Sequence, residues 1–389
     1  MKICRVASVP FFLQHHLREQ ICATANAGHQ VTLIAGDGPE IAALEHLPSI
    51  EFVLIDIARQ ISPWRDLRAL WRLYLHFRQS GYDIVHSTTP KAGMLCAIAG
   101  LMAGVPVRLH TFTGQPWMEL HGLKRFVAKA GDWVTAHLNT MSYADSISQR
   151  DFLIEQGITS SSKMAVIGRG SLAGVDVVRF DETPWQDQGT ELQKQLGITK
   201  STVVITFVGR LTRDKGVSEL VEAFSQLIQS GKQCVLLLVG PQEPDRDPLP
   251  SATLAKIAEN PMIIATGYSD MPEKYLAVTD IFCLPSYREG FGNVVIEAAA
   301  MGVPTVGTDI VGLRDSIENG ETGLLVPPKT TDELAAGLRL LIDDPDLRGK
   351  MGERARSRAR REFDSRKINA DVLEEYERLA QLHLRRVRV

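Results

Sequence analysis

Apolar and polar positions along the chain fall into blocks that predict strands alternating with helices. Short apolar runs bounded by glycine, proline or polar residues alternate with longer segments of helical spacing. Strands are expected at 3–7, 31–35, 52–55, 84–87, 107–111 and 138–141, and again at 203–208, 235–239, 263–266, 281–284, 305–308 and 323–326. Such alternation favours parallel sheets covered by helices, so the expected fold class is α/β with one sheet in each half.

A glycine-rich segment followed by polar residues separates the two halves. Residues 167–176 contain three glycines, and residues 181–190 are largely polar. We therefore expect an N-terminal domain at 1–176 and a C-terminal domain at 177–365. A helical pattern at 368–384 predicts a final helix within 366–389, and the apolar stretch 92–107 predicts a buried helix.

Composition is that of an ordinary globular protein large enough for two domains. The 389 residues are 44% hydrophobic and 23% charged, and the net charge of −3 gives no overall attraction to nucleic acid. The five cysteines have no C-x-x-C spacing and fall in apolar contexts, as expected for reduced thiols in the cytoplasm. No signal-peptide pattern follows Met1, and the stretch 92–107 is too short to span a bilayer comfortably.

The most informative chemistry lies at 288–297, where two glutamates are separated by seven residues that include a glycine pair. The strand expected at 281–284 leads into Glu289, Gly290, Phe291, Gly292 and Asn293, and a helix is predicted to follow from 294. The first N–H groups of a helix lack partners and attract anions such as phosphate. Glu289 could reach sugar hydroxyls and Glu297 ribose hydroxyls. Alternatively, Glu297 only complements the helix dipole and Glu289 is a solvated loop residue.

This stretch resembles the E-x7-E motif of retaining GT-B glycosyltransferases of family 4. A second segment, 207–216, is similar to the family's G-R-L-x3-K-G element and contains Gly209, Arg210 and Lys215. The resemblance implies two Rossmann-like domains facing each other across a cleft, a final helix that returns to the N-terminal domain, and a hinge at 167–176. It also implies that the arginine and lysine bind the diphosphate of a nucleotide-sugar donor, where two cations suit a departing anion.

From the resemblance we expect transfer of a hexose or N-acetylhexosamine from a UDP-sugar, with no metal and no other cofactor. Glu289 would orient the donor sugar and Glu297 the ribose, while Gly267 and Tyr268 would lie near the base. The segments 87–93 and 110–115 are similar to members that build bacterial surface polysaccharides on polyprenyl-diphosphate carriers. The expected acceptor is therefore a lipid-linked saccharide bound by the N-terminal domain.

Four residues of the N-terminal half are candidates for the acceptor side: Lys91, His110, Thr113 and Gly114. Thr113 occupies the place where many family members have a histidine, and the loop after the first strand lacks the usual glycines. His110 lies three residues too early to replace that histidine, and it is otherwise interpreted as a hydrogen-bonded histidine at a strand end. Lys91 could face an acceptor diphosphate or simply reach solvent.

Two segments suggest contact with a membrane surface. Within 64–74, Leu67, Leu70, Trp71 and Tyr74 share one helical face, with arginines on its flank. Residues 117–126 combine further apolar and basic side chains. The alternative for the first segment is a surface helix that packs its apolar face on the sheet. The enzyme is therefore expected in the cytoplasm, and peripheral association with the inner face of the cell membrane stays open.

Other chemistries have little support in the sequence. Asp245-Arg246-Asp247 matches the metal-binding D-x-D pattern but falls in a proline-rich loop, and G-x-S-x-G, P-loop and H-E-x-x-H motifs are absent. Two alternatives stay open: a GT-B relative with other chemistry, such as a nucleotide-sugar epimerase or a phosphorylase, and a nucleotide-sugar-binding protein without catalysis. The sequence names neither the sugar nor the acceptor, and it is silent on oligomeric state.

Overall fold

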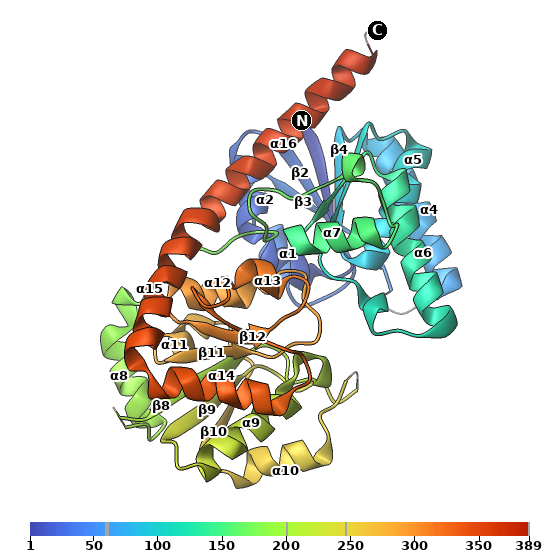
Figure 1. Ribbon diagram of the computed structural model, residues 1–389. Helices are drawn as coiled ribbons and strands as arrows, with labels where there is room; N and C mark the ends of the chain where they lie inside the picture. The colour runs from blue at the N-terminus through green and yellow to red at the C-terminus, as the bar shows by residue number, and fades with distance from the viewer. Residues whose placement is uncertain (59–61, 200, 246, 388–389) are drawn as a thin grey trace. The chain divides into compact units, whose positions relative to one another are not determined.

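The computed structural model describes residues 1–58, 62–199, 201–245 and 247–387, and the chain forms two compact units (Figure 1). Unit 1 comprises Met1–Ala173 and Ser365–Val389, and unit 2 comprises Gly174–Asp364. The change from unit 1 to unit 2 therefore occurs inside the glycine-rich segment 167–176. Residues 388–389 of the expected final helix and Arg246 lie outside the described residues.

Unit 1 is built on a parallel seven-stranded sheet in the order β3-β2-β1-β4-β5-β6-β7. Its strands are β1 (Lys2–Val6), β2 (Gln30–Ala35), β3 (Ile50–Leu54), β4 (Ile84–Thr88), β5 (Val107–Phe112), β6 (Met141–Ala144) and β7 (Met164–Ala165). Its helices are α1 (Pro10–His16), α2 (Arg18–Asn26), α3 (Ile41–Glu45), α4 (Pro63–Ser80), α5 (Pro90–Ala103), α6 (Gly122–Leu138), α7 (Ile147–Glu155) and α16 (Ser365–Val387).

Alternation along β1 shows how this sheet divides its core. Cys4 and Val6 point to the face that packs against α4 and α5, whereas Ile3 points to the face that packs against Val372 and Tyr376 of α16. The helix expected at 92–107 is α5, which is buried along much of its length and ends before Gly104. The final helix begins at Ser365, and its described part belongs to unit 1.

Unit 2 contains a parallel six-stranded sheet in the order β10-β9-β8-β11-β12-β13. Its strands are β8 (Val203–Val208), β9 (Cys234–Val239), β10 (Ile263–Gly267), β11 (Ile281–Leu284), β12 (Thr305–Thr308) and β13 (Gly323–Val326). Its helices are α8 (Gln186–Gln195), α9 (Val217–Gln229), α10 (Ser251–Glu259), α11 (Pro272–Leu276), α12 (Asn293–Ala300), α13 (Leu313–Ser316), α14 (Thr331–Asp343) and α15 (Pro345–Glu362).

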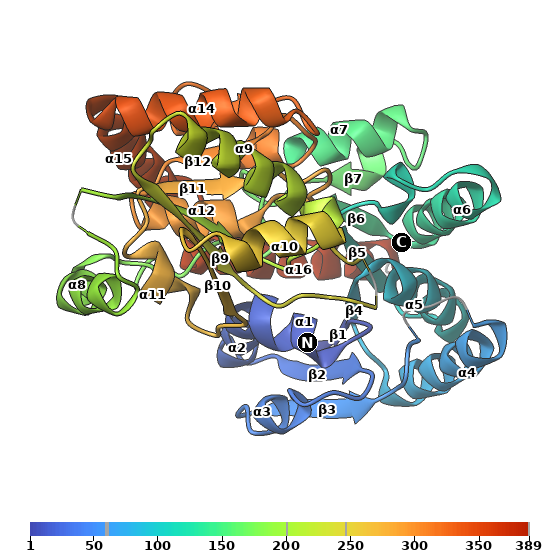
Figure 2. The ribbon, with the colours of Figure 1, turned by 90° about the horizontal axis from the view of Figure 1, so that it is seen from below.

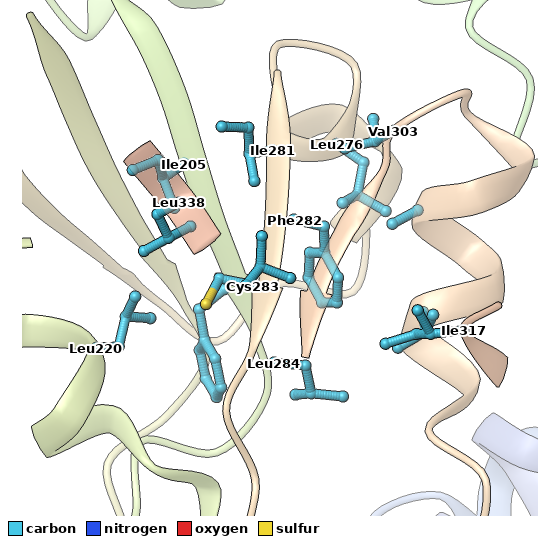
Figure 3. Packing of buried hydrophobic residues seen from close by; sticks show 14 of the residues in the cluster. Ile205, Leu220, Leu276, Ile281, Phe282, Cys283, Leu284, Val303, Ile317 and Leu338 are labelled. Atoms are coloured by element: carbon cyan, nitrogen blue, oxygen red, sulfur yellow. The ribbon is translucent and has the colours of Figure 1, made fainter. Parts of the chain in front are cut away.

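The central strand β11 is buried on both faces. Ile205 of β8, Leu220 of α9 and Leu338 of α14 lie on one side of it, and Leu276, Val303 and Ile317 lie on the other (Figure 3). A parallel strand covered by helices on both faces needs a continuous apolar run, which Ile281–Leu284 provides. The parallel α/β organisation expected from the sequence is confirmed in both units.

Two details of the strand prediction are wrong. The sixth strand is at Met141–Ala144 rather than 138–141, because α6 continues to Leu138 and Asn139 caps it by donating a side-chain hydrogen bond to the Thr135 carbonyl. The two-residue strand β7 is missing from the prediction, since two residues are too few to show a period of two.

In both sheets the strand order reverses between the first and fourth strands of the unit. These are β1 and β4 in unit 1, and β8 and β11 in unit 2. Parallel α/β sheets bind ligands outside the carboxyl ends of the strands at such a reversal. The loops after β8 and β11 in unit 2, and those after β1 and β4 in unit 1, are therefore the places to look for function.

Candidate active site

The loops that follow β8 and β11 touch through their backbones. Gly216 has φ +69°, and a Cβ added there would lie 2.1 Å from the carbonyl oxygen of Pro285. The Tyr287 amide donates a 2.9 Å hydrogen bond to the Asp214 carbonyl across the same contact. Only glycine allows this approach, so residue 216 brings the G-R-L-x3-K-G element and the E-x7-E element together.

Lys215 and Glu289, one from each loop, form a largely buried ion pair. Lys215 Nζ lies 2.5 Å from Glu289 Oε1, and the two side chains are 17% and 14% exposed. The Ser286 hydroxyl donates a 2.7 Å hydrogen bond to the same Glu289 oxygen. The two residues that the sequence assigned to diphosphate and sugar are thus in direct contact at the strand-order reversal.

Arg210 stands beside this pair with its own carboxylate partners. Its guanidinium lies 2.8 Å from Glu243 and 3.8 Å from Asp214. Burial would raise the pKa of Asp214, but the hydroxyl of Thr212 and the nearby Lys215, Arg210 and Arg288 cations bring it below its usual value. The cations of the site therefore face carboxylates, which are anions that a diphosphate could replace.

Helix α12 begins at this edge of the sheet. Its N-cap is Gly292 with φ +83°, where a Cβ would lie 2.6 Å from Leu313 Cδ2. Gly290 is close to Gly312, because a Cβ on Gly312 would lie 2.7 Å from the Gly290 carbonyl oxygen. Phe291 is buried and anchors the loop in the core of unit 2 by an edge contact with Phe363. The N-terminal end of α12 at Asn293 is held in place by these contacts.

Glu297 lies in the second turn of α12, close to a charged pair that sequence reasoning missed. Burial raises the pKa of Glu297 to about 7, against the lowering effect of Arg179, while Glu273 raises it further. Arg179 itself contacts Glu273 at 2.9 Å and donates a hydrogen bond to the Asp270 carbonyl. Nothing in the sequence marked Arg179 and Glu273, because they are 94 residues apart.

The remaining donor-side candidates lie along the same carboxyl edge. Gly209 follows β8 with φ +151°. Gly240, which follows β9, lies so close that a Cβ on it would be 1.8 Å from the Gly209 carbonyl oxygen. Gly267 ends β10, two strands from β8, and accepts a 2.8 Å hydrogen bond from the Gly240 amide. Tyr268, next to it, is 57% exposed. The edge is continuous from β10 to β11.

Asp247, the second aspartate of the D-x-D pattern at 245–247, stabilises the loop after β8. Its carboxylate accepts a 2.8 Å hydrogen bond from the Asp214 amide. Within the described residues, no group of three or more His, Cys, Asp or Glu side chains is arranged to hold a metal ion.

The acceptor-side candidates belong to unit 1. Lys91, at the start of α5, lies 2.7 Å from Asp66 of α4, and it is only 14% exposed, so the expectation that it reaches solvent is wrong. Thr113 is half-buried and Gly114 is buried with φ +123°, directly after β5. At the strand-order reversal, the Ser8 amide and hydroxyl lie 3.1 and 3.0 Å from Thr89 Oγ1, a pairing that the sequence did not suggest.

His110 is in the interior of unit 1. It is 1% exposed, its Nδ1 lies 3.0 Å from the Ser87 hydroxyl, and its ring packs so closely on α5 that a Cβ on Gly93 would lie 2.5 Å from it. Burial lowers its pKa to about 3. The neutral imidazole is therefore the form that this packing accommodates.

His110→Gln is expected to reduce the acid sensitivity of unit 1. The folded pKa of His110 is depressed, so the stability linked to it is present above pH 6.5 and is lost as pH falls toward about 3; at pH 5 the loss is about 2 kcal/mol. Denaturant melts at pH 7.5 and 5 followed by tryptophan fluorescence would measure this, since Trp64, Trp71, Trp117 and Trp133 are in unit 1. The exposed His121 supplies the control, His121→Gln. Equal pH dependence of wild type and His110→Gln would contradict the expectation.

Comparison with known proteins shows which family the chain belongs to. The model of the "Glycosyl transferase 4-like domain" matches residues 13–170, and that of "Glycosyl transferases group 1" matches residues 188–358. A capsular polysaccharide biosynthesis glycosyltransferase, CapM, of Staphylococcus aureus is 30% identical over 90% of this chain and 90% of its own length. The chain belongs to glycosyltransferase family 4. The resemblance seen in the E-x7-E and G-R-L-x3-K-G elements is thereby confirmed.

Two further comparisons concern a relative and the fold. An Escherichia coli enzyme named UDP-Gal:alpha-D-GlcNAc-diphosphoundecaprenol alpha-1,3-galactosyltransferase is 27% identical over 76% of each chain. The crystal structure of Anabaena Alr3699/HepE in complex with UDP covers 97% of this chain and all of its own, with a TM-score of 0.80 and 20% identity. This family 4 glycosyltransferase therefore has the GT-B fold. The name of its Staphylococcus aureus relative places that relative in capsular polysaccharide biosynthesis.

Proposed function

We propose that the enzyme transfers a hexose or N-acetylhexosamine from a UDP-sugar to a hydroxyl of a polyprenyl-diphosphate-linked saccharide, with retention of the anomeric configuration. The observation that carries the donor half is the meeting of Lys215, Glu289 and Arg210 at the strand-order reversal of unit 2. The acceptor half is supported by the name of the Escherichia coli relative, which acts on a diphosphoundecaprenol-linked sugar.

In this proposal Arg210 and Lys215 bind the donor diphosphate, together with the N-terminal end of α12 at Asn293. The diphosphate replaces Glu243 and Asp214 as a partner of Arg210, which is 37% exposed and within reach of a ligand. Lys215 exchanges Glu289 for the phosphate, so Glu289 is released to accept hydrogen bonds from sugar hydroxyls. Positive charge from side chains thus meets the developing charge of the leaving group, and transfer needs no metal.

Glu297 accepts hydrogen bonds from the ribose hydroxyls, and the nearby Arg179 favours its ionised form. In the transfer step the bond between the anomeric carbon and the phosphate oxygen breaks while the acceptor oxygen bonds to the same carbon. The leaving phosphate oxygen takes the acceptor proton on the same face of the sugar. The enzyme supplies position and charge, and it forms no covalent bond to the sugar.

A thermal-shift panel of UDP, GDP, ADP and their sugar conjugates tests the donor site. A ligand that binds the folded protein raises Tm, so UDP and UDP-sugars are expected to raise it most, and Glu297→Ala is expected to lose the shift. The exposed Glu259 of α10 supplies a matched control, Glu259→Ala, which should keep the shift. Absence of a shift with every nucleotide would overturn the donor assignment.

Release of UDP separates transfer from the alternative chemistries. If the enzyme transfers sugar to a lipid-linked saccharide, UDP appears only when such an acceptor is added. UDP-sugar conversion without an acceptor would instead indicate an epimerase, and binding without any turnover would indicate a non-catalytic protein. In cells the reaction would take place at the cytoplasmic side of the membrane, where nucleotide sugars and the carrier meet.

A further inference from the structure

Helix α4 has two apolar faces, and only one of them packs on the sheet. Ala69, Leu73 and Phe77 are buried in the core of unit 1. Trp64, Leu67, Trp71 and Leu75 repeat at helical spacing on the outside and are 84%, 56%, 56% and 38% exposed. The sequence alternative, in which the face with Leu67, Leu70, Trp71 and Tyr74 packs on the sheet, is confirmed for the partly buried Leu70 and Tyr74. It is wrong for Leu67 and Trp71, which are exposed.

Helix α6 also exposes apolar side chains, and it buries polar ones. Its buried positions include Asp132, Thr135 and Ala136, whereas four of its larger apolar side chains are exposed. These are Leu123 (76%), Phe126 (70%), Val127 (47%) and Trp133 (48%). A helix that buries polar side chains and exposes phenylalanine and tryptophan is not explained by the core of its own unit.

Helix α5 joins the two. It packs against α4 on one side and α6 on the other, and Figures 1 and 2 show the three helices along one side of unit 1. Leu101 and Met102 at its C-terminal end are 48% and 51% exposed. We call the exposed apolar side chains of these helices the outer helical face; they are Trp64, Leu67, Trp71, Leu75, Leu101, Met102, Leu123, Phe126, Val127 and Trp133.

Basic residues accompany the outer helical face. Helices α4 and α6 carry seven lysines and arginines, namely Arg65, Arg68, Arg72, Arg78, Lys124, Arg125 and Lys129, against two acidic residues, Asp66 and Asp132. Of the seven, Arg65 is paired with Asp56, which precedes α4. Both acids are engaged within unit 1, since Asp66 pairs with Lys91 and the buried Asp132 accepts a 2.6 Å hydrogen bond from Trp117. The excess is local, because the whole chain has a net charge of −3.

The combination fits an anionic lipid surface better than a second copy of the chain. Tryptophan and phenylalanine settle at the headgroup boundary, and lysine and arginine contact the phosphates of anionic lipids. Two copies of this face would instead bring basic helices against each other, which opposes association. Charge complementarity therefore selects the bilayer as the partner.

The position of this face also suits the proposed acceptor. Helix α5 starts directly after β4, and the Lys91–Asp66 contact brings the start of α4 to the same carboxyl edge of the sheet. Trp64 and Leu67 belong to the first turns of α4, and Leu123 and Phe126 to the first turns of α6. The apolar side chains thus begin at the edge that carries Ser8, Thr89 and the loop after β5.

We propose that the outer helical face binds an anionic lipid bilayer, with its aromatic side chains at headgroup depth and its arginines and lysines on lipid phosphates. This goes beyond the proposed function, since it uses no residue of the donor site and requires no lipid-linked acceptor. It adds to that function a way for unit 1 to hold the edge of its sheet at the membrane that contains the carrier lipid.

Cosedimentation of the full chain with vesicles tests the proposal. Binding is expected to vesicles of phosphatidylcholine with phosphatidylglycerol, to weaken with salt, and to be much lower with phosphatidylcholine alone. Trp64→Ser with Phe126→Ser should weaken binding by about tenfold or more, and Arg68→Gln with Arg125→Gln by roughly fivefold for each cation removed. The matched control on unit 2 is Leu340→Ser with Lys350→Gln, at exposed positions, which should bind as wild type.

The same variants keep the result interpretable. All four changed residues on the outer helical face are exposed, so Tm and the UDP thermal shift are expected to match wild type. Absence of wild-type binding to the anionic vesicles, or binding that survives both double substitutions, would overturn the proposal and leave the donor assignment untouched. A dimer that dissociates in Trp64→Ser with Phe126→Ser, without vesicle binding, would overturn it in favour of a second copy.

Discussion

Replacing Lys215 with methionine is expected to lower kcat by about 100-fold or more, because a cation that meets the charge developing on the leaving diphosphate is removed. Methionine preserves much of the length of the side chain without its charge. The variant should also bind UDP more weakly, since the diphosphate loses a contact already present in the bound ground state. Steady-state transfer and UDP titration measure the two effects.

Glu289→Gln separates the roles of the two members of the ion pair. If Glu289 orients the sugar, this variant should lose kcat but keep UDP affinity, because UDP carries no sugar. The affinity of this variant for UDP should even rise. In the wild type the Glu289 carboxylate, 2.5 Å from Lys215, neutralises the lysine, and in the variant that negative charge is gone. A fall in UDP affinity equal to that of Lys215→Met would show that the pair acts only as a structural unit.

The matched control for the lysine is Lys256→Met. Lys256 is exposed on α10 of the same unit and pairs with Glu222, so its loss removes a surface ion pair and leaves the strand-order reversal unchanged. Surface pairs of this kind contribute little to stability. Unchanged transfer by Lys256→Met, beside a large loss in Lys215→Met, would locate the effect at the site.

The sheets were predictable from sequence because parallel strands leave a strong signal. Val203–Val208 and Ile281–Leu284 are continuous apolar runs between turn residues, and the structure has strands at those residues. The segment around Leu138 is apolar as well, but whether it ends a helix or begins a strand depends on how Asn139 caps α6. The start of β6 is set by the pairing of Met141 with Leu109 of β5, which the local pattern does not record, so the boundary there was wrong by three residues.

The candidate site was predictable to the level of its motifs and no further. Spacing identified Lys215 and Glu289 separately, 74 positions apart in the sequence. Their contact depends on β8 and β11 being neighbours in the sheet, which the spacing does not reveal. Likewise Lys91 has Asp66 as its partner because α4 and α5 pack side by side. Pairings across elements are decided by topology, and a single sequence carries no direct record of them.

The face to which a helix turns its apolar side chains was the other point that sequence could not decide. On α4, two apolar stripes of similar strength compete, and the pattern alone does not say which packs on the sheet. The stripe of Ala69, Leu73 and Phe77 is the buried one, and these side chains pack in one core cluster with Cys4 and Val6 of β1. The larger aromatic stripe is left outside, where it becomes available to a partner.

Gly216→Ala is expected to destabilise unit 2 strongly. An alanine at φ +69° costs about 1–2 kcal/mol by itself. Its Cβ would also lie 2.1 Å from the Pro285 carbonyl oxygen, so the loops after β8 and β11 must move apart, at a further cost of about 1–3 kcal/mol. Differential scanning calorimetry should show a lower Tm for unit 2.

Gly231→Ala is the control that isolates the contact. Gly231 follows the C-terminal end of α9 with φ +80°, much like Gly216 before its N-terminal end, but a Cβ there would meet nothing within 4 Å. The two variants share the backbone cost, so the difference in Tm, at about 2–4 °C per kcal/mol for a unit of this size, reports the loop contact. Because that contact also holds Lys215 against Glu289, Gly216→Ala should lose UDP binding while Gly231→Ala retains it. Equal losses in the two variants would mean that the left-handed backbone, and not the approach of the two loops, is what glycine supplies at position 216.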